Sequence, residues 1–584
     1  MSSSLHSPSA SPSSSARPPA PTSAPRRAFR WQILIAVGGF ALLIALLISQ
    51  GPPGAPGVAQ PAEGGAYAEA LVGEIVRLNP LLDFANQVDR DVDRLLYRGL
   101  VRFDGRGLPQ PDLAEGWSVS ADGTLYTVTI RPDAAWHDGE PVTSDDVIYT
   151  FSQFQDPDHP GSADAVAMWQ AINIIRLDDR TVQFQLPEAF APFLDYLATG
   201  LLPDHLLRGA QIEDLIDHPF NLEPIGTGPF KFQRFLLDEG EITGVVLEAF
   251  GDFYAGRPFL DRLEFRTYPT TDDAVAAYTA GEVQGLSTID LEHFASILDD
   301  PDLNQYTARL PRSGVVFLNL RDPEAAFLAE KEVRQALLLA TNRQWLIDVA
   351  LDGQGIVAAG PMLPGSWATD DDSEPAPYDP AQAVILLEGG GWEIPTGATP
   401  GSAEYVRTKD DVALSFELTH ADDPLAGKIA RALQANWQAI GVQTTLRPLG
   451  EEALIPDALE QGDFQALLTE IDFSPYPDPD PYPFWHDTQI ETGQNYGGFD
   501  DRNSSIWLER ARTTPDLGLR ADYYRSFQHR FRDQVPALFL YHPVYNYAVD
   551  GTVQGISVGP MFDASDRLQS AAEWFLIARR APGG

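Results

Sequence analysis

The sequence predicts a mixed α/β protein with a partly parallel sheet. Residues 412–418 place apolar side chains at alternate positions, residues 425–440 repeat apolar residues at helical spacing, and residues 443–449 resume as a strand. Gly441 is a typical residue for ending the helix. The joints are short, and a strand–helix–strand unit of this kind pairs its two strands in parallel.

Three further patterns support a mixed fold. Residues 125–130 alternate between two Asp-Gly turns, which is typical of a hairpin. Thr143 and Asp146 have the spacing of a capping box and predict that a helix begins there. Residues 331–351 have the apolar spacing of one amphipathic helix.

Length and charge narrow the class of protein. A chain of 584 residues is too long for a single core, and 44% hydrophobic residues suffice for several. The 83 acidic and 40 basic residues give a net charge of −43, so no nucleic-acid partner is expected. The chain has no cysteine, which excludes disulfides, thiolate metal sites and anchoring through a lipid-modified cysteine.

The N-terminal region is predicted to anchor the chain in a membrane. Residues 1–25 are rich in Ser, Pro and Ala, which is typical of disorder. Residues 31–48 contain no charge, and as a helix they would span about 27 Å, close to the thickness of a hydrocarbon core. Arg26, Arg27 and Arg30 place the preceding end in the cytoplasm. A cleaved signal peptide is the alternative, and in both cases the rest of the chain is extracytoplasmic.

Residues 475–487, PYPDPDPYPFWHD, are the most unusual stretch of the chain. Alternating prolines favour a rigid, extended loop, and it follows an apolar strand expected at 464–472. No lysine or arginine occurs between Arg447 and Arg502, whereas 13 acids do. Rigid aromatics beside carboxylates favour the wall of a pocket for a polar or cationic organic ligand. The alternative is a surface loop whose aromatics pack on a neighbouring domain.

Motifs of catalysis and metal binding are poorly represented. There is no Walker-type loop, no HExxH and no GxSxG. His137 and Asp138 precede a glycine and are better explained by a turn than by a metal site. No nucleophile stands near His486 and Asp487 in a recognisable context, so this pair is expected to form hydrogen bonds in a pocket. We therefore expect no catalytic residue, no metal and no cofactor.

Ten short motifs occur in an order that resembles a known family. They are LNPLL at 78–82, LLYRGLVRFD at 95–104, PDLAEGWSVSADGTLYTVTIRPDAAWHDGEPVTSDDVIYTF at 111–151, GLLPDHLL at 200–207, PIGTGPFKF at 224–232, GEVQG at 281–285, VRQALLLATNR at 333–343, YDPAQAVILLEGGGW at 378–392, PDPDPYPFWH at 477–486 and PALFLYHPVYNYAV at 536–549. Together they resemble the extracytoplasmic solute-binding proteins of peptide, opine and nickel ABC transporters, known as family 5.

The resemblance implies a two-lobed, periplasmic-binding-protein-like α/β fold with mixed sheets, an inserted extra domain and a hinged cleft. The expected divisions are a disordered cytoplasmic N-terminus at 1–25, a transmembrane signal anchor at 26–50, a flexible tether at 51–65, lobe I at 66–110, 221–318 and 551–580, the extra domain of lobe I at 111–220, and lobe II at 319–550.

The same resemblance guides the choice of binding residues. Peptide-binding members hold the ligand amine with an aspartate in the loop that corresponds to the proline-rich stretch, and Pro475 occupies that position here. Asp472, Asp478 or Asp480 could substitute, or the ligand is not a peptide. The residues expected to contact the solute are Tyr476, Tyr482 and Trp485 as apolar walls, Asp478 and Asp480 as charges, and His486, Asn495 and Tyr496 as hydrogen-bond partners.

The function expected from these observations is that of a monomeric, membrane-tethered receptor. It would capture a small organic solute, with a peptide as the first guess, by lobe closure and deliver it to an ABC permease. Residues 31–48 would hold it at the cell membrane as a single-pass protein with its C-terminal domain outside. The alternatives are a surface hydrolase of peptides or glycans, with paired carboxylates such as Asp478 and Asp480, and a solute sensor without an importer.

Overall fold

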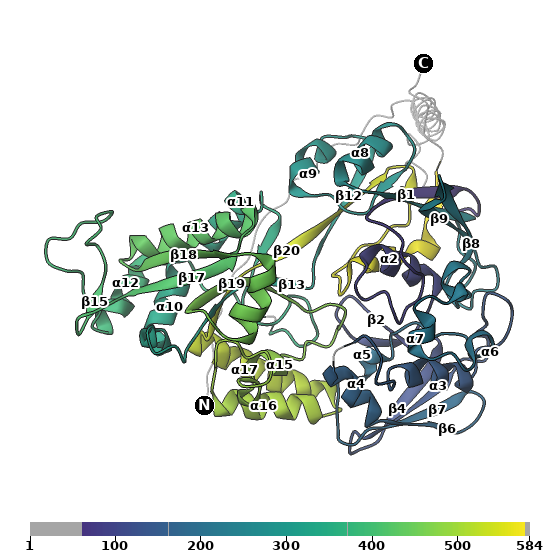
Figure 1. Cartoon of the computed structure of the whole chain (residues 1–584), viewed down its shortest axis with the longest axis horizontal. Coiled ribbons are helices and arrows are strands. Elements are labelled where there is room, and N and C mark those ends of the chain that lie inside the picture. Colours follow the sequence, from purple (N-terminus) through teal and green to yellow (C-terminus); the bar gives the residue numbers. More distant parts are fainter. Residues whose placement is uncertain (1–60, 162, 371, 578–584) are drawn as a thin grey trace, which may run out of the picture. The chain divides into compact units, whose positions relative to one another are not determined.

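A computed structural model describes residues 61–161, 163–370 and 372–577 (Figure 1). The expected N-terminus, the anchor helix and the first ten residues of the tether lie outside the described residues. Among the helices that are described, none is long and apolar enough to cross a membrane. Helices and strands alternate along the chain, which confirms the predicted α/β class.

The largest sheet of the described residues has twelve strands. These are β1 (Ala66–Val72), β8 (Phe230–Asp238), β9 (Glu241–Ala249), β10 (Arg262–Tyr268), β11 (Gly285–Leu286), β12 (Leu303–Arg309), β13 (Arg312–Leu318), β14 (Gly355–Val357), β17 (Ser415–Ala421), β18 (Gln443–Leu449), β19 (Ala466–Asp472) and β20 (Ala537–Asp550). Neighbouring strands follow the order β18-β17-β19-β13-β20-β11-β1-β10-β9-β8, while β12 and β14 also pair with β20.

The predicted strand–helix–strand unit is confirmed. Helix α13 (Pro424–Ala439) connects β17 to β18, and the two strands pair in parallel. The Asp423 side chain caps the helix by accepting hydrogen bonds from the amides of Leu425 and Ala426, both at 2.9 Å. Gly441 follows the helix with a positive φ of 82°, which suits glycine.

A separate four-stranded sheet has the order β4-β5-β7-β6 (β4, Ala114–Val119; β5, Leu125–Ile130; β6, Asn173–Arg176; β7, Thr181–Gln185). Strands β4 and β5 are antiparallel, as the alternation at 125–130 predicts. Helix α3 (Ser144–Gln153) begins at the predicted capping box, in which Asp146 accepts a hydrogen bond of 2.8 Å from the Thr143 amide.

The prediction of one helix at 331–351 is wrong. The segment forms α10 (Lys331–Ala340) and α11 (Arg343–Ala350). The Asn342 side chain accepts a hydrogen bond of 3.0 Å from the Trp345 amide and so caps the second helix. The apolar periodicity continues across this break, whereas the local side-chain-to-backbone bond favours a new helix start.

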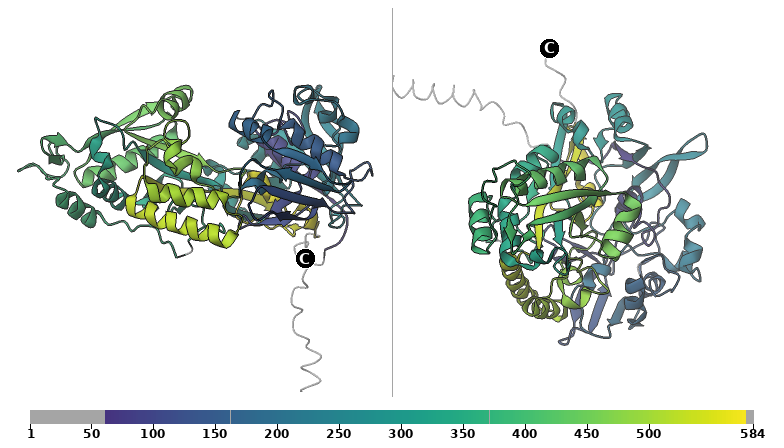
Figure 2. Two further views of the ribbon diagram at one scale, coloured as in Figure 1. Left: turned by 90° about the horizontal axis from the view of Figure 1, so that it is seen from below. Right: turned by 60° about the vertical axis from the view of Figure 1, so that its left-hand side comes forward.

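The remaining elements are shorter or flank the sheets. The helices are α2 (Gln87–Leu96), α4 (Ala163–Gln170), α5 (Phe193–Tyr196), α6 (Asp204–Leu207), α7 (Ile212–Leu215), α8 (Thr271–Thr279), α9 (Leu291–Leu298), α12 (Pro380–Gly389), α14 (Glu451–Ala453), α15 (Tyr482–Trp485), α16 (Arg502–Thr513) and α17 (Leu517–Gln534). The strands are β2 (Val101–Phe103), β3 (Pro109–Pro111), β15 (Thr408–Lys409), β16 (Val412–Ala413), β21 (Val553–Gln554) and β22 (Phe575–Leu576). Helices α16 and α17 lie side by side, as the yellow-green pair in Figure 2 shows.

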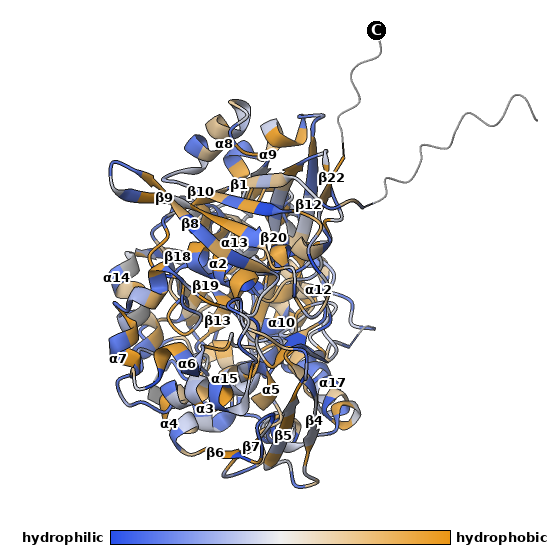
Figure 3. Cartoon of the chain, turned by 90° about the vertical axis from the view of Figure 1, so that its right-hand side faces the viewer, coloured by the Kyte–Doolittle hydropathy of each residue, from blue (hydrophilic) through white to orange (hydrophobic). Residues whose placement is uncertain are grey.

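Strand β13 separates two hydrophobic clusters because its side chains alternate between the faces of the sheet. Val316 and Leu318 pack with α10, α11 and α13, whereas Val315 and Phe317 pack with Trp485 and the helices α16 and α17. Figure 3 shows hydrophobic residues, in orange, among the strands of the large sheet and a hydrophilic turn, in blue, between β8 and β9. Both faces of this part of the sheet are therefore buried.

Strand β20 connects two regions of the large sheet. Its first residues pair with β13, and residues from Val544 onward pair with β12. Tyr545 and Val549 belong to the cluster around β1, β9, β10 and α2, whereas Leu538 and Leu540 belong to the cluster around β13. One continuous strand thus joins two cores (Figure 1).

A buried ion-pair network stabilises the packing of β1 against α2. Arg567 binds Glu69 of β1 at 2.8 Å and Asp91 of α2 at 2.7 Å, and all three side chains are almost completely buried. The Tyr67 and Tyr547 hydroxyls donate hydrogen bonds of 2.7 and 2.6 Å to Glu69. The charges therefore have partners throughout, as buried ions require.

The C-terminal end of α2 is held by a close approach of two glycines. A Cβ at Gly226 or Gly228 would lie about 2 Å from the carbonyl oxygen of Leu96 or Leu95, so only glycine fits. His137 lies beside them: its Nδ1 accepts from the Gly226 amide and its Nε2 donates to the Gly228 carbonyl, both at 3.1 Å. The ring is buried and neutral in this arrangement.

The burial of His137 predicts a specific loss of stability in acid. Burial lowers the pKa of His137 to about 4, below the unfolded value of about 6.5, so the unfolded chain binds this proton first as the pH falls. Stability is full above pH 6.5 and is lost progressively toward pH 4. Between pH 7.5 and 5.0 the residue contributes a loss of about 2 kcal/mol.

Urea unfolding at the two pH values tests this expectation with a His137→Gln variant. Glutamine keeps a hydrogen-bonding group but does not titrate, so the fall in unfolding free energy should be smaller than in the original protein by about 2 kcal/mol. An equal fall in both proteins would contradict the assignment of this titration to His137.

Candidate functional site

A cavity of about 450 Å³ is the main candidate for a binding site. Its wall combines the turn before α2, one side of α2, the segment after β2, parts of α4 and α5, the segment 560–569, and Pro475, Tyr476 and Pro477. The last three lie three to five residues after the end of β19, so the proline-rich stretch contributes to a cavity near the carboxyl end of a strand. The volume is typical of sites for small organic molecules.

Eight aromatic side chains line this cavity. They are Phe84, Tyr97, Phe103, Phe154, Trp169, Tyr196, Tyr476 and Phe562. Phe154 stacks on Trp169 with ring centroids 5.5 Å apart, and Tyr476 lies 5.2 Å from Tyr196. Phe84 and Tyr476 are exposed although they line the cavity, which leaves their ring faces available to a ligand.

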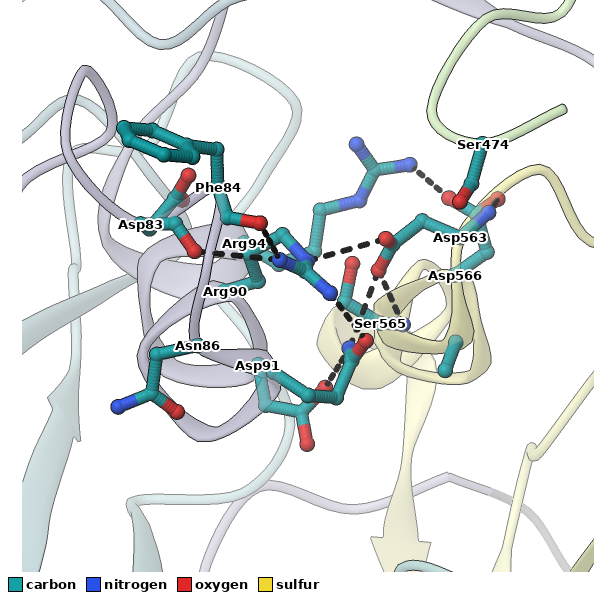
Figure 4. Close-up of polar contacts among 12 residues, drawn as sticks. Asp83, Phe84, Asn86, Arg90, Asp91, Arg94, Ser474, Asp563, Ser565 and Asp566 are labelled. Carbon is teal, nitrogen blue, oxygen red and sulfur yellow. Dashed lines mark hydrogen bonds and ion pairs between the residues drawn. The ribbon is translucent and has the colours of Figure 1, made fainter. Parts of the chain in front are cut away.

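The charged residues of the wall are mainly acidic. Six aspartates, at positions 83, 93, 104, 195, 563 and 566, face three arginines, at positions 90, 94 and 102. Figure 4 shows how two of the arginines are used: Arg90 binds Asp563 at 3.1 Å, and Arg94 binds Asp566. Arg90 also donates to the carbonyl oxygens of Asp83 and Phe84. The arginines of α2 are thus directed to the segment 563–566.

Asp93 is the least satisfied acid of the wall. The residue is only 3% exposed, and its carboxylate forms no ion pair among the described residues. Burial, together with the charges of Asp83 and Asp89, raises the pKa of Asp93 well above its ordinary value, against the opposing effect of the Asn79 amide. Burial likewise raises the pKa of Asp83 well above its ordinary value, with Arg90 opposing.

Asp195 is a second buried acid of the wall, on α5. It accepts a hydrogen bond of 2.7 Å from the Asp478 amide and so attaches the proline-rich stretch to α5. Burial raises the pKa of Asp195 well above its ordinary value, and the neighbouring charge of Asp478 adds to this effect. Three acids of the wall, Asp83, Asp93 and Asp195, therefore hold a proton more tightly than an exposed aspartate does.

Of the eight residues expected to contact the solute, Tyr476 lines the cavity. The acids bind arginines: Asp478 pairs with the buried Arg520 at 2.7 Å, and Asp480 pairs with Arg512 at 3.0 Å. Both arginines come from the helical pair α16 and α17. In this structure the two carboxylates therefore fix the stretch to its own surroundings, and their role toward a solute stays a prediction.

The other five predicted residues lie in the same part of the fold, away from the cavity wall. Trp485 is 2% exposed and belongs to the cluster on the α16–α17 side of β13. Tyr482 stacks on His486 with ring centroids 4.1 Å apart, and His486 Nδ1 lies 2.8 Å from the Thr488 hydroxyl. Asn495 donates to the carbonyls of His486 and Phe499, and Tyr496 lies 5.5 Å from Phe317. Their contact with a solute also stays a prediction.

Several wall residues were not singled out from the sequence, notably Phe84, Asp93, Asp195 and Tyr196. In the helix sequence DRDVDR at 89–94, residues four apart carry like charges, Asp89 with Asp93 and Arg90 with Arg94. This pattern indicates a charged helix but not which charges pair outside it. The pairing depends on segment 563–566, more than 460 residues away in the sequence. No local signal could identify Asp93.

Comparison with known proteins defines the class of this molecule. Residues 109–492 match the family model described as bacterial extracellular solute-binding proteins, family 5. The chain belongs to this family, as its ten motifs suggested. The described region is accordingly extracytoplasmic.

Individual relatives cover most of the chain. It is 27% identical over 532 residues to the oligopeptide-binding protein AppA of Bacillus subtilis, covering 88% of this chain and 92% of that protein. It is 28% identical over 496 residues to the dipeptide-binding protein of Escherichia coli, with coverage of 80% and 87%. These relatives are binding proteins rather than enzymes.

Solved structures confirm the two-lobed fold. AppA of Bacillus subtilis in complex with a nonapeptide superposes with a TM-score of 0.64 at 26% identity, covering 89% of this chain and 100% of that one. NikZ of Campylobacter jejuni in complex with Ni(L-His) gives a TM-score of 0.64 at 27% identity, with coverage of 87% and 99%. The fold is thus shared by proteins whose ligands differ widely in size.

Proposed function

We propose that this protein captures a small organic solute outside the cytoplasm and delivers it to an ABC importer permease. The observation that carries the proposal is a cavity of about 450 Å³ with aromatic and acidic walls in a chain of the family 5 solute-binding proteins. Because the relatives named above include oligopeptide- and dipeptide-binding proteins, a peptide-like ligand is the first candidate.

The division into lobes gives the proposed mechanism. Residues 66–110, 221–318 and 551–580 would form lobe I, with residues 111–220 as its extra domain, and residues 319–550 would form lobe II. Solute would stabilise the closed arrangement by binding it more tightly than the open one. Strand β20 supports this division because it passes between the two cores and can act as part of the hinge.

Membrane attachment completes the proposal. The uncharged segment 31–48 would anchor a monomer beside its permease, with residues 51–65 as a tether. A tether raises the effective concentration of the receptor at its partner. A hydrolase function has less support, because Asp478 and Asp480 each bind an arginine and are not positioned as an acid–base pair around one bond of a substrate.

Native mass spectrometry of the full chain tests the proposed function. A ligand present at a hundred times its Kd adds about 2.7 kcal/mol to stability, so a receptor of this kind is expected to retain solute through purification. We expect a reproducible mass above that of the denatured chain, released on unfolding. No added mass, together with no thermal stabilisation by any member of a peptide and small-solute library, would contradict a receptor function. Turnover of a library member would favour the hydrolase.

A further inference from the structure

The strongest unexplained feature of the cavity is a buried carboxyl group without a counter-ion. Asp93 lies in the wall, is 3% exposed, and forms no ion pair within the described part of the chain; the Asn79 amide is the hydrogen-bond donor that acts on its pKa. The ionised form of such a group is costly unless it is paired. The protein therefore retains, beside an open volume, a group that a ligand could satisfy.

The nearby positive charges do not fill this role. Arg90 and Arg94 leave α2 toward Asp563 and Asp566, as Figure 4 shows, although they neighbour Asp93 on the same helix. Two of the three arginines of the wall are thus already paired and the third, Arg102, is exposed, whereas the buried Asp93 has no counter-ion among the described residues. This arrangement favours a positively charged occupant for the cavity over a negatively charged one.

The acids of the proline-rich region are paired as well. Asp472 binds Arg312 at 3.0 Å, Asp478 binds Arg520 at 2.7 Å, and Asp480 binds Arg512 at 3.0 Å. None of these three belongs to the cavity wall. The sequence suggested that one of these three acids replaces the family aspartate whose position Pro475 occupies. Because all three bind arginines, an acid of α2 is the better candidate for this role.

We propose that Asp93, assisted by Asp83, anchors an ammonium or other organic cationic group of the solute in this cavity. The inference rests on the proposed receptor function and specifies its ligand class. The anchor comes from α2, whereas Pro475 belongs to the segment after β19, and both residues line the cavity. Eight aromatic side chains in the wall suit an organic cation, because ring faces attract positive charge.

Binding should be linked to a proton. The groups that act on Asp93 are the acids Asp83 and Asp89, the Asn79 amide and the neighbouring Tyr97 hydroxyl. In the empty cavity the acids hold a proton more tightly than usual, and a bound cation favours the ionised form. Binding therefore releases a proton, and affinity should rise with pH by no more than about tenfold per unit.

Matched pairs of probes test the proposal on the full chain. Each pair joins a cation to an uncharged counterpart: trialanine amide and N-acetyltrialanine amide, choline and 3,3-dimethylbutanol, and 1,4-diaminobutane and 1,4-butanediol. Thermal shift identifies binders, and calorimetry measures their affinity at pH 5.5 and 7.5. We expect at least one cation to bind at least about tenfold more tightly than its counterpart, and more tightly at the higher pH.

An Asp93→Asn variant should lose at least about tenfold in affinity for that cation and lose the pH dependence. Asp83→Asn should weaken binding less, and Asp238→Asn, which replaces an exposed acid at the end of β8, should have no effect. Far-ultraviolet circular dichroism and the melting temperature verify that each variant is folded. Should Asp93→Asn not fold, Asp93→Ser provides the same comparison.

Three results would overturn the inference. If only uncharged probes bind, or if the Asp93 variants bind the cation as tightly as the original protein, the anchor is wrong while the receptor function stands. If no probe binds but native mass spectrometry detects a retained solute, that solute must be cationic and must be lost in Asp93→Asn. A retained anionic or neutral solute overturns the proposal. Absence of both binding and retention counts against the receptor function itself.

Discussion

Replacing Arg567 by methionine is expected to lower the free energy of unfolding by about 3–5 kcal/mol. The guanidinium binds Glu69 and Asp91, and all three groups are almost completely buried. Methionine has a similar length but leaves two buried carboxylates without their counter-ion. Because Glu69 lies on β1 and Asp91 on α2, the loss should loosen the elements that carry Asp93 and the cavity wall.

Urea unfolding of Arg567→Met measures this effect, with Arg176→Met as the matched control. Arg176 also contacts two acids, Asp145 and Asp179, but its side chain is 45% exposed. Its replacement should cost less than about 1 kcal/mol. Adding Glu69→Gln and Asp91→Asn to Arg567→Met should restore part of the stability by removing the unpaired charges. An equal loss of unfolding free energy in Arg567→Met and Arg176→Met would show that the buried network stabilises the protein no more than an exposed ion pair does.

Replacing Trp485 by alanine is expected to cost about 3–5 kcal/mol of stability. The indole is 2% exposed, contacts Phe531 edge-to-face at 4.7 Å between centroids, and lies 5.8 Å from Phe317. Alanine would leave a large cavity in the cluster on the α16–α17 side of β13. The proline-rich stretch, which contains this residue, would lose one of its contacts with the core.

Tyr476→Ala is the informative comparison, because both residues belong to the same stretch. Tyr476 is 45% exposed and lines the cavity, so its loss should change the unfolding free energy by less than about 1 kcal/mol. It should instead weaken binding of the retained solute. A large loss of stability from Tyr476→Ala with little from Trp485→Ala would reverse the roles that the structure indicates.

Local sequence patterns predicted much of the fold because their physical cause is local. The capping box at Thr143, the parallel unit around α13 and the strand before Pro475 each follow from spacing within a few residues. The break between α10 and α11 was missed although Asn342 is a favourable capping residue, because the apolar period masks it. The hydrogen bond of the Asn342 side chain starts a new helix there, although the apolar periodicity continues.

The candidate site was predicted less well because it depends on distant partners. Pro475, Tyr476 and Pro477 line the cavity, yet the acids of the same stretch bind arginines on α16 and α17. Sequence composition suggested unpaired charge between Arg447 and Arg502, whereas the compensating cations follow just after. Asp93 is unusual only because Arg90 and Arg94 bind segment 563–566. Such pairings arise from the tertiary fold and have no signature at short range.

The most direct test is a crystal structure of the full chain with the solute that it retains. We expect the solute in the cavity between α2 and the loop at Pro475–Pro477, with a positively charged group within hydrogen-bond distance of Asp93 and an apolar part against Tyr476. A solute bound elsewhere in the molecule, or one that occupies this cavity with an uncharged or anionic group facing Asp93, would contradict the assignment of the site.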